Sequence, residues 1–213
     1  MGQPPGLSEQ QRRALAALKR IPGTSGLYLA RGAGVAWHLG HRISNDLDLF
    51  SVGRTLAFSP LRRAILSRVR GAEVLALSDA TLRVRMEGIP VDVVRYPYPP
   101  LEPPRRGPQG IRVAGLKDLA AMKLATIAGR GLRRDFWDLY AIVRAGMPLT
   151  TAVRAYETRF GLAEPELYHL ARALTYFDDA EREEVFPRGL TERRWSTIKA
   201  FFRREAPKLL RAR

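Results

Sequence analysis

The sequence contains no cysteine among its 213 residues. This absence excludes a disulfide framework and a cysteine-ligated zinc site. No apolar run approaches the roughly 20 residues that a membrane-spanning helix needs, and the N-terminus lacks the apolar core of a signal peptide. We therefore expect a protein without a membrane segment, located in the cytoplasm.

Several catalytic patterns are missing too. The chain has no G-x-x-x-x-G-K-[ST] loop, no G-x-S-x-G elbow and no cysteine nucleophile. Lysine is scarce, since only five of the 36 basic residues are lysines. Acidic residues number 21, which leaves a net charge of +15. This charge favours a nucleic acid or a nucleotide as partner, although an arginine-rich composition alone explains part of it.

The proline-rich segment 97–110 divides the chain. It holds six of the 15 prolines, which are incompatible with a helix or a central strand. Helices and short strands are expected before this segment, and the pattern after it is helical. We therefore predict a domain boundary here, between residues 1–110 and residues 111–213.

The expected elements follow from hydrophobic periodicity and turn signals. Ser8 and Gln11 have the spacing of a capping box at a helix start, and Pro60 is expected at the first position of another helix. Strands are expected at 27–30 and 46–50, with a meander of 73–77, 82–86 and 89–94 beside the latter. Helices are expected at 8–20, 115–129, 133–146, 149–160, 164–177 and 191–205.

The stretch Arg31–Phe50 (RGAGVAWHLGHRISNDLDLF) reads as a glycine-containing turn, a short helix, a polar loop and a strand. Because neighbouring strand residues point to opposite faces, Asp46 and Asp48 share one face, and Leu47 and Leu49 share the other. Two carboxylates one strand repeat apart can hold hard divalent cations. An isolated D-x-D is more often the solvated acidic face of an edge strand.

Asp92 is the one polar residue in the apolar strand run 91–94. An aspartate in such a run costs stability unless it is paired or bound to a metal. If its strand neighbours that of Asp46 and Asp48, the three carboxylates form a cradle for two magnesium ions. Such a pair of ions activates a hydroxyl and steadies a leaving pyrophosphate. The alternative is an aspartate on the open face of the sheet.

Lys123 falls within the apolar stripe of the expected helix 115–129. It either snorkels to water or reaches into a site, where a triphosphate is the natural target of its charge.

Asp135 and Asp138 share a face of the next helix, at whose start the dipole favours a carboxylate. Asp135 could orient Lys123 or act as a base. The alternative is a capping aspartate that pairs at the surface with Arg134 or Arg130.

Four segments, in this order, resemble the AbiEii-type nucleotidyltransferase toxins of the DNA polymerase β-like superfamily. They are LGHRISNDLDLF, VDVVRYPYP, GIRVAGLKDLAAMKLATIAGRGLRRDFWDLYAI and ALTYFDDAE, and the match runs from about residue 27 to about residue 187. The resemblance implies an α+β fold, with a small mixed sheet and flanking helices in residues 1–110 followed by an all-helical domain in residues 111–213.

The resemblance also implies an activity and its partners. A nucleotide would pass from an NTP to an acceptor with the help of Mg²⁺, or of Mn²⁺ in its place. In relatives the acceptor can be the 3′ end of tRNA, and blocking that end stops translation. Such toxins usually sit beside an antitoxin, often a winged-helix protein.

The resemblance assigns the ligands of a two-ion metal site to three aspartates, Asp46, Asp48 and Asp92. Lys123 matches the lysine that contacts the triphosphate, and Asp135 and Asp138 match the two aspartates of a K/R-D-x-x-D-L element. The helical domain would thus contribute Lys123 and Asp135 to the site. Arg130 or Arg134 would offset charge on the triphosphate.

The chain departs from the family at its first motif. Relatives have Gly-Gly or Gly-Ser followed by a small hydroxyl residue, and this motif holds the β- and γ-phosphates. Here the aligned residues are Arg31, Gly32 and Ala33, so one glycine remains and the hydroxyl is missing. Arg31 either contacts phosphate as a bidentate donor or obstructs the turn that a glycine allows.

The leading hypothesis is therefore a magnesium-dependent nucleotidyltransferase of the toxin–antitoxin type that modifies RNA, with the tRNA 3′ end as the expected acceptor. A second hypothesis is a degenerate, non-catalytic member that binds nucleotide, RNA or a partner protein without turnover. A third is a basic RNA-binding module whose aspartates are structural.

Overall fold

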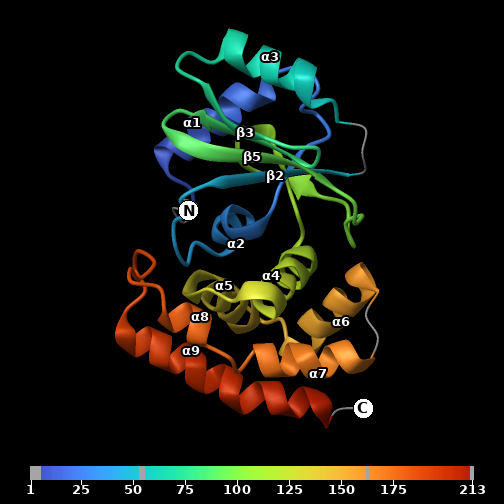
Figure 1. Ribbon diagram of the computed structural model, residues 1–213, viewed down its shortest axis with the longest axis vertical. Helices are drawn as coiled ribbons and strands as arrows, with labels where there is room; N and C mark the ends of the chain where they lie inside the picture. The colour runs from blue at the N-terminus through green and yellow to red at the C-terminus, as the bar shows by residue number, and fades with distance from the viewer. Residues whose placement is uncertain (1–5, 53–55, 162–163, 212–213) are drawn as a thin grey trace. The chain divides into compact units, whose positions relative to one another are not determined.

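The computed structural model describes residues 6–52, 56–161 and 164–211 (Figure 1). The chain divides into two compact units, residues 1–115 and residues 116–213. The described part of the first unit contains a mixed sheet and three α-helices, and that of the second is helical throughout. The predicted α+β class, with a mixed sheet followed by helices, is confirmed.

The first unit is built around a seven-stranded sheet with the strand order β3-β4-β5-β2-β1-β7-β6. Strands β2 and β5 are parallel, as are β1 and β7, and the other neighbouring pairs are antiparallel. The strands are β1 (Tyr28–Leu29), β2 (Leu47–Val52), β3 (Glu73–Leu77), β4 (Thr81–Met86), β5 (Ile89–Tyr96), β6 (Arg105–Arg106) and β7 (Arg112–Val113).

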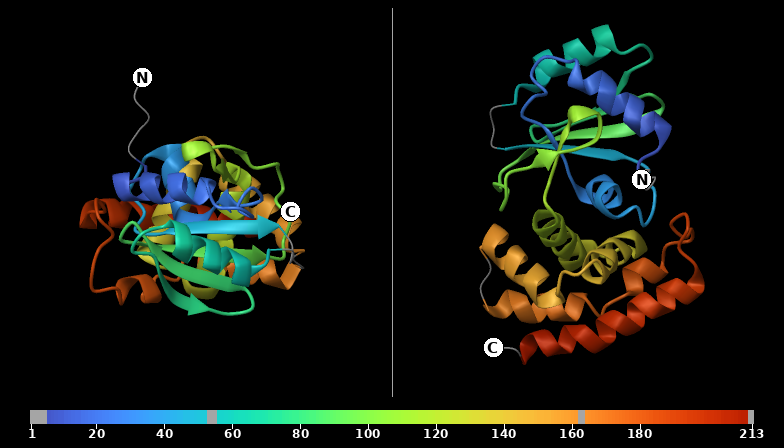
Figure 2. Two further views of the ribbon diagram at one scale, coloured as in Figure 1. Left: turned by 90° about the horizontal axis from the view of Figure 1, so that it is seen from above. Right: turned by 180° about the vertical axis from the view of Figure 1, so that it is seen from behind.

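Helices cover both faces of this sheet (Figures 1 and 2). Helices α1 (Glu9–Lys19) and α3 (Phe58–Arg68) lie over one face, and α2 (Arg31–Leu39) lies on the opposite side. The face under α1 and α3 carries the apolar core, to which alternate residues of the central strands contribute Leu47, Leu49, Leu82, Val84, Val91 and Val93. Because side chains alternate along a strand, the intervening residues, which include Asp48 and Asp92, belong to the other face.

Most of the predicted elements are confirmed. The meander β3-β4-β5 lies beside β2, and the capping box of Ser8 and Gln11 is present at the start of α1. Helix α3 begins at Phe58, so Pro60 is its third residue and the predicted first position was wrong. The proline-rich segment 97–110 contains β6 at the edge of the sheet and the 3₁₀ turn η1 (Pro108–Gly110).

The second unit consists of α4 (Leu116–Arg130), α5 (Arg133–Arg144), α6 (Leu149–Phe160), α7 (Glu164–Ala173), α8 (Asp178–Glu181), α9 (Glu192–Glu205) and the 3₁₀ turn η2 (Ala206–Leu210). Aromatic rings from α5, α9 and the loop before α8 form part of its core, with centroids 5.0 to 5.9 Å apart: Phe136, Phe177, Trp195 and Phe202. Burying such rings is a large apolar contribution for a unit of this size.

A buried ion pair joins α4 to α6. The carboxylate of Asp118, in the first turn of α4, forms an ion pair with the guanidinium of Arg159 in α6, and both side chains are fully buried. The negative charge of Asp118 also lies where the helix dipole favours it. The sequence pattern did not indicate this pair, because each residue on its own reads as surface charge.

None of the helices in the part of the chain described here has the length and apolar character needed to cross a bilayer.

Candidate active site

The centre of the candidate site is a pair of aspartates on adjacent parallel strands. In the register of β2 and β5, Asp48 lies directly opposite Asp92. Neighbouring strands are about 4.8 Å apart, so the two side chains leave the same face of the sheet side by side. The predicted juxtaposition of these two strands is therefore present, and both residues are largely buried.

The third predicted carboxylate, Asp46, lies one residue before β2. Its Oδ1 accepts a hydrogen bond of 2.9 Å from the hydroxyl of Ser44. The buried amide of Gln11 in α1 donates to the main-chain carbonyls of Asp46, at 3.1 Å, and of Ser44, at 3.0 Å. Gln11 also caps α1, so one side chain ties the helix start to the loop that carries Asp46. This second role of Gln11 was not predicted, because the sequence spacing of a capping box does not show whether the glutamine amide also donates to a distant carbonyl.

Arg31 opens α2 with a left-handed backbone, at φ 46°. Its Nη1 lies 3.2 Å from Oδ1 of Asp48, and its guanidinium carbon lies 5.3 Å from the centroid of the Phe50 ring. The position that the resemblance aligns with a family glycine therefore has a backbone conformation that glycine adopts without strain. Arginine takes up the same turn and offsets its strain with contacts to β2.

The strain at Arg31 predicts how two substitutions will differ in stability. Arg31→Gly removes both the ion pair and the strain, whereas Arg31→Ala removes the ion pair and keeps the strain. A non-glycine residue in this region costs about 1 kcal/mol, so the glycine variant should be more stable than the alanine variant by about that amount. Urea unfolding of both variants measures the difference, and an alanine variant as stable as the glycine variant would contradict it.

Asp92 is held by a second arginine. Nε and Nη2 of Arg83, in β4, donate to Oδ1 and Oδ2 of Asp92 at 2.7 and 2.6 Å, a bidentate pair. The hydrogen bond to Asp92 raises the pKa of Arg83 above its ordinary value, and the charges of Asp46 and Asp48 add to this effect. Arg83 is thus electrostatically coupled to all three predicted metal ligands. Arg83 alternates with the buried Leu82 and Val84 along β4, and the register of β4 with β5 sets it opposite Asp92.

The residues themselves provide a test of whether a metal ion fits here. The donors are carboxylate oxygens on neighbouring strands, which are the ligands that Mg²⁺ prefers. Within the described ranges, however, no three His, Cys, Asp or Glu side chains are arranged as a group that could hold a metal ion. Oxygens of Asp48 and Asp92 instead contact Arg31 and Arg83. The donor set fits the ion, provided that the arginines give up these oxygens.

Gly32 and Ala33, the other residues of the first motif, lie in the first turn of α2 and are buried. Ala33 belongs to the apolar core. The N–H groups of a first helical turn have no acceptor within the helix, which suits them to bind phosphate oxygens. The motif therefore offers backbone amides, and the side chain of Ala33 faces apolar neighbours.

In the second unit, the structure brings Lys123 together with both aspartates of the following helix. Its Nζ lies 2.9 Å from Oδ1 of Asp135 and 2.7 Å from Oδ2 of Asp138. The lysine and both aspartates are buried, with 4% of Lys123 exposed, so this cation does not snorkel to water. Asp135 also accepts from the main-chain N–H of Leu132 at 3.3 Å and thereby caps α5. Capping and orienting Lys123 were predicted as alternatives, and Asp135 makes both contacts.

The neighbouring arginines differ from one another in exposure. Arg130 and Arg134 are exposed. Arg133 is buried, its main-chain N–H donates to the carboxylate of Glu183, and its guanidinium lies over Phe186. Only the two exposed arginines therefore keep guanidiniums in contact with solvent, where an anionic partner can reach them.

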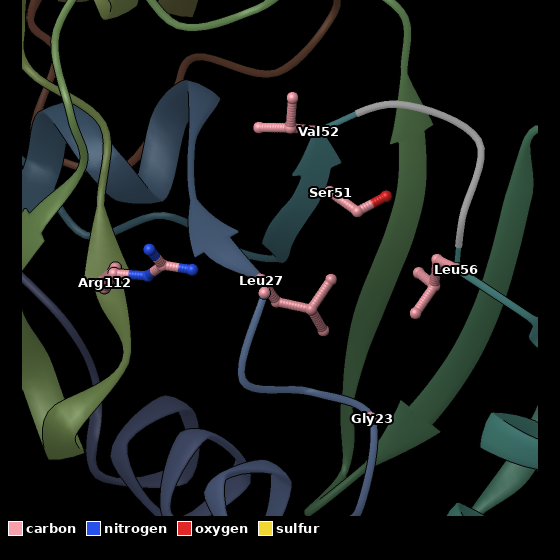
Figure 3. Close-up of a pocket in the computed structure, with 7 residues that line it drawn as sticks. Gly23, Leu27, Ser51, Val52, Leu56 and Arg112 are labelled. Atoms are coloured by element: carbon pink, nitrogen blue, oxygen red, sulfur yellow. The ribbon is translucent and has the colours of Figure 1, made fainter.

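A cavity of about 290 Å³ lies beside the end of β2 that carries Ser51 and Val52 (Figure 3). It is lined by Gly23, Gly26, Leu27, Ser51, Val52, Leu56 and Arg112. Nη2 of Arg112 donates to the main-chain carbonyl of Ser25 at 2.9 Å. The cavity shares no residue with the predicted site and provides no cluster of acidic ligands.

A mixed sheet that carries paired carboxylates on adjacent strands, beside a helix start that can accept phosphates, defines the class of this protein as a nucleotidyltransferase. The family model described as nucleotidyl transferase AbiEii toxin, Type IV TA system, matches residues 13–212. The chain belongs to this family of nucleotidyltransferase toxins.

Individual proteins are similar to this chain in sequence or in fold. The uncharacterized protein aq_aa25 of Aquifex aeolicus (strain VF5) is 34% identical over 209 residues, which cover 96% of this chain and 98% of that protein. Among solved structures, the nucleotidyltransferase toxin MenT4 (Rv2826c) of Mycobacterium tuberculosis H37Rv has a TM-score of 0.61 at 17% identity, covering 94% of this chain and 84% of its own. JHP933 of Helicobacter pylori has a TM-score of 0.54 at 14% identity, covering 96% and 95%. At these identities, the two structures show a shared fold.

Proposed function

We propose that this protein transfers a nucleotide from an NTP to RNA in a magnesium-dependent reaction, with the 3′ end of tRNA as the acceptor. The observation that supports this proposal best is the pair of facing carboxylates, Asp48 and Asp92, in a chain of the AbiEii family. Such a reaction needs a place where an acceptor hydroxyl and an α-phosphate are aligned, and catalysis consists mostly of positioning and electrostatics.

Asp46, Asp48 and Asp92 would hold the divalent ions, either Mg²⁺ or Mn²⁺. When bound, such ions neutralise phosphate charge and lower the pKa of an attacking hydroxyl. The oxygen of the acceptor hydroxyl would form the bond to the α-phosphorus, and Asp92 would take the proton of that hydroxyl. The bond between that phosphorus and the bridging oxygen of the β-phosphate breaks, and pyrophosphate leaves.

The remaining roles concern the triphosphate. The first turn of α2, with Gly32 and Ala33, supplies main-chain N–H groups for phosphate oxygens. The proposed contribution of Lys123 and Asp135 to the site rests on the resemblance to the family. Arg130 or Arg134, both exposed and close to Lys123 in the sequence, would add charge that binds the triphosphate. In this proposal, Asp135 orients the ammonium of Lys123, which is consistent with the 2.9 Å contact between them.

The proposed acceptor accounts for the charge of the chain. A net charge of +15 attracts an RNA and speeds its approach. Helix α9 carries exposed basic residues, which are Arg193, Arg194, Arg203 and Arg204. We propose this helix as a surface that contributes to RNA binding. An acceptor tRNA would place the reaction in the cytoplasm, and a winged-helix antitoxin would be the partner that restrains it.

The proposal is tested by incubating the protein with Mg²⁺, total cellular RNA and each of the four NTPs, labelled on the α-phosphate. The double variant Asp46→Ala, Asp48→Ala is the matched control, because it removes two of the proposed metal ligands. We expect one NTP to label an RNA of tRNA size with the wild-type protein and no label with the variant. Sequencing the 3′ ends of the labelled RNA then identifies the acceptor.

Two outcomes would overturn the proposal. Equal labelling by the double variant would show that these aspartates do not serve the reaction. A shift in melting temperature on addition of an NTP and Mg²⁺, without label in any RNA, would instead favour a non-catalytic member that binds nucleotide.

A further inference from the structure

The two facing carboxylates are each in contact with an arginine from a neighbouring element. Arg31, at the start of α2, reaches Asp48 at 3.2 Å, and Arg83, in β4, reaches both oxygens of Asp92 at 2.6 and 2.7 Å. The family resemblance did not predict a cation on either aspartate. Arg83 in particular lay outside every motif that the sequence offered.

The pairing has an electrostatic reason. Asp46, Asp48 and Asp92 bring a formal charge of −3 to one end of the sheet, and like charges this close repel each other. Two guanidinium groups reduce that formal charge to −1. A divalent cation would serve the same purpose, so arginine and metal are alternative counter-ions for the same oxygens.

The exposure of the side chains shows which partner can move. The side chains of Arg31 and Arg83 are 50% and 51% exposed, whereas those of Asp48 and Asp92 are 9% and 12% exposed. The aspartates are fixed by the strands that carry them, and the arginines approach from the solvent. A long, half-exposed arginine side chain can swing back into water, and the cation that replaces it then compensates the charge of the largely buried carboxylate.

We propose that Arg31 and Arg83 are exchangeable counter-ions. In the metal-free protein, Arg31 pairs with the carboxylate of Asp48 and Arg83 with that of Asp92. When a divalent cation binds these carboxylates, the two arginines release them and bind the phosphates of the nucleotide that arrives with the cation. This inference rests on the proposed function. A guanidinium suits both states, because its planar donors bind carboxylate and phosphate equally well in bidentate fashion.

The proposal predicts that one substitution will have two opposite effects. Arg83→Gln removes the competitor for Asp92, so the variant should bind Mn²⁺ more tightly. It also removes a phosphate ligand, so the same variant should bind the metal–nucleotide complex more weakly. A residue that only stabilised the fold would not change the two affinities in opposite directions.

The first measurement is the affinity for Mn²⁺ alone, from the electron paramagnetic resonance signal of the free ion. For Arg83→Gln we expect the Kd to fall about three- to ten-fold, the range that a bidentate but half-exposed ion pair covers. Arg85→Gln is the matched control, because Arg85 lies two residues along the same strand and pairs instead with Glu73. It removes the same charge close by and should leave the Kd within about two-fold of that of the wild-type protein.

The second measurement is the affinity for the α,β-methylene analogue of each of the four NTPs in saturating Mn²⁺, by titration calorimetry. We expect a Kd about ten-fold higher for Arg83→Gln, in line with the loss of one charged hydrogen-bonding group. Arg31→Ala should show the same pair of opposite changes through Asp48. Circular dichroism then verifies that each variant retains its fold.

The outcomes separate this inference from the proposed function. If the wild-type protein and all variants fail to bind Mn²⁺, the metal site itself is wrong. If the wild-type protein binds Mn²⁺ and Asp92→Asn abolishes that binding, the metal site stands. In that case, an unchanged Kd for Arg83→Gln, an equal change for Arg85→Gln, or tighter binding of the nucleotide by Arg83→Gln would each overturn the role of the arginines.

Discussion

Replacing Asp48 by asparagine should lower the rate of nucleotide transfer by at least about 10³-fold, because a bound cation contributes several kcal/mol to such a reaction. Asparagine keeps the shape of the side chain and removes the charge that the proposed metal ions need. The substitution removes the buried charge together with its ion pair to the half-exposed Arg31, so the free energy of unfolding should change by no more than about 1 kcal/mol. The rate of label transfer to RNA and the urea midpoint, measured on the same preparation, give both quantities.

Asp79→Asn is the matched control for Asp48→Asn. Asp79 is an exposed carboxylate in the turn between β3 and β4. Its substitution by asparagine removes the same charge from the same unit of the chain. Its rate should equal that of the wild-type protein. If Asp48→Asn kept more than a tenth of the wild-type rate, Asp48 could not be a ligand of an essential metal.

The largest expected effect on stability is at the buried ion pair of the second unit. Arg159→Met should lower the free energy of unfolding by about 3–5 kcal/mol, because it leaves the fully buried carboxylate of Asp118 without that guanidinium. Methionine retains much of the volume of arginine, so a cavity is not the main cause. Urea unfolding followed by circular dichroism measures the loss.

A second substitution tests the cause of this loss. Adding Asp118→Leu to Arg159→Met removes the buried charge and should restore most of the lost stability, since apolar replacements of a buried pair are often neutral or better. Arg182→Met is the surface control, because Arg182 pairs with Asp179 where it is 75% exposed, and its cost should stay below about 0.5 kcal/mol. A double variant as unstable as Arg159→Met would mean that the charge of Asp118 is not responsible.

Side-chain alternation and helix-end signals in the sequence predicted those parts of the fold that depend on neighbouring residues alone. The alternation of β2 placed Leu47 and Leu49 on the core face and Asp48 on the other, as the structure has them. Helix α6 has the predicted bounds, because its apolar stripe ends at a glycine that takes the left-handed conformation. Short strands were missed: β6 and β7 have two residues each, too few for an alternating pattern to appear.

The partners of charged side chains could not be predicted in the same way. Asp92 was recognised as costly in an apolar strand, but the sequence offered many arginines and gave no means to choose Arg83 among them. The choice depends on the register of β4 against β5, where Arg83 lies directly opposite Asp92. Arg159 and Asp118 are likewise brought together by the packing of α6 against α4. The hydrophobic periodicity of each helix does not indicate which residues of the other helix it will contact.

The pairing of β2 with β5 also determines when a newly made chain can bring its two facing carboxylates together. Asp48 and Asp92 are 44 positions apart (92 − 48), and they meet only after the hairpin β3-β4 and strand β5 have left the ribosome. At about 5–20 residues per second, synthesis up to Tyr96 takes roughly 5 to 20 seconds. A nascent or truncated chain that stops before β5 therefore carries the D-x-D motif but not the pair of facing carboxylates, and should be harmless to the cell that makes it.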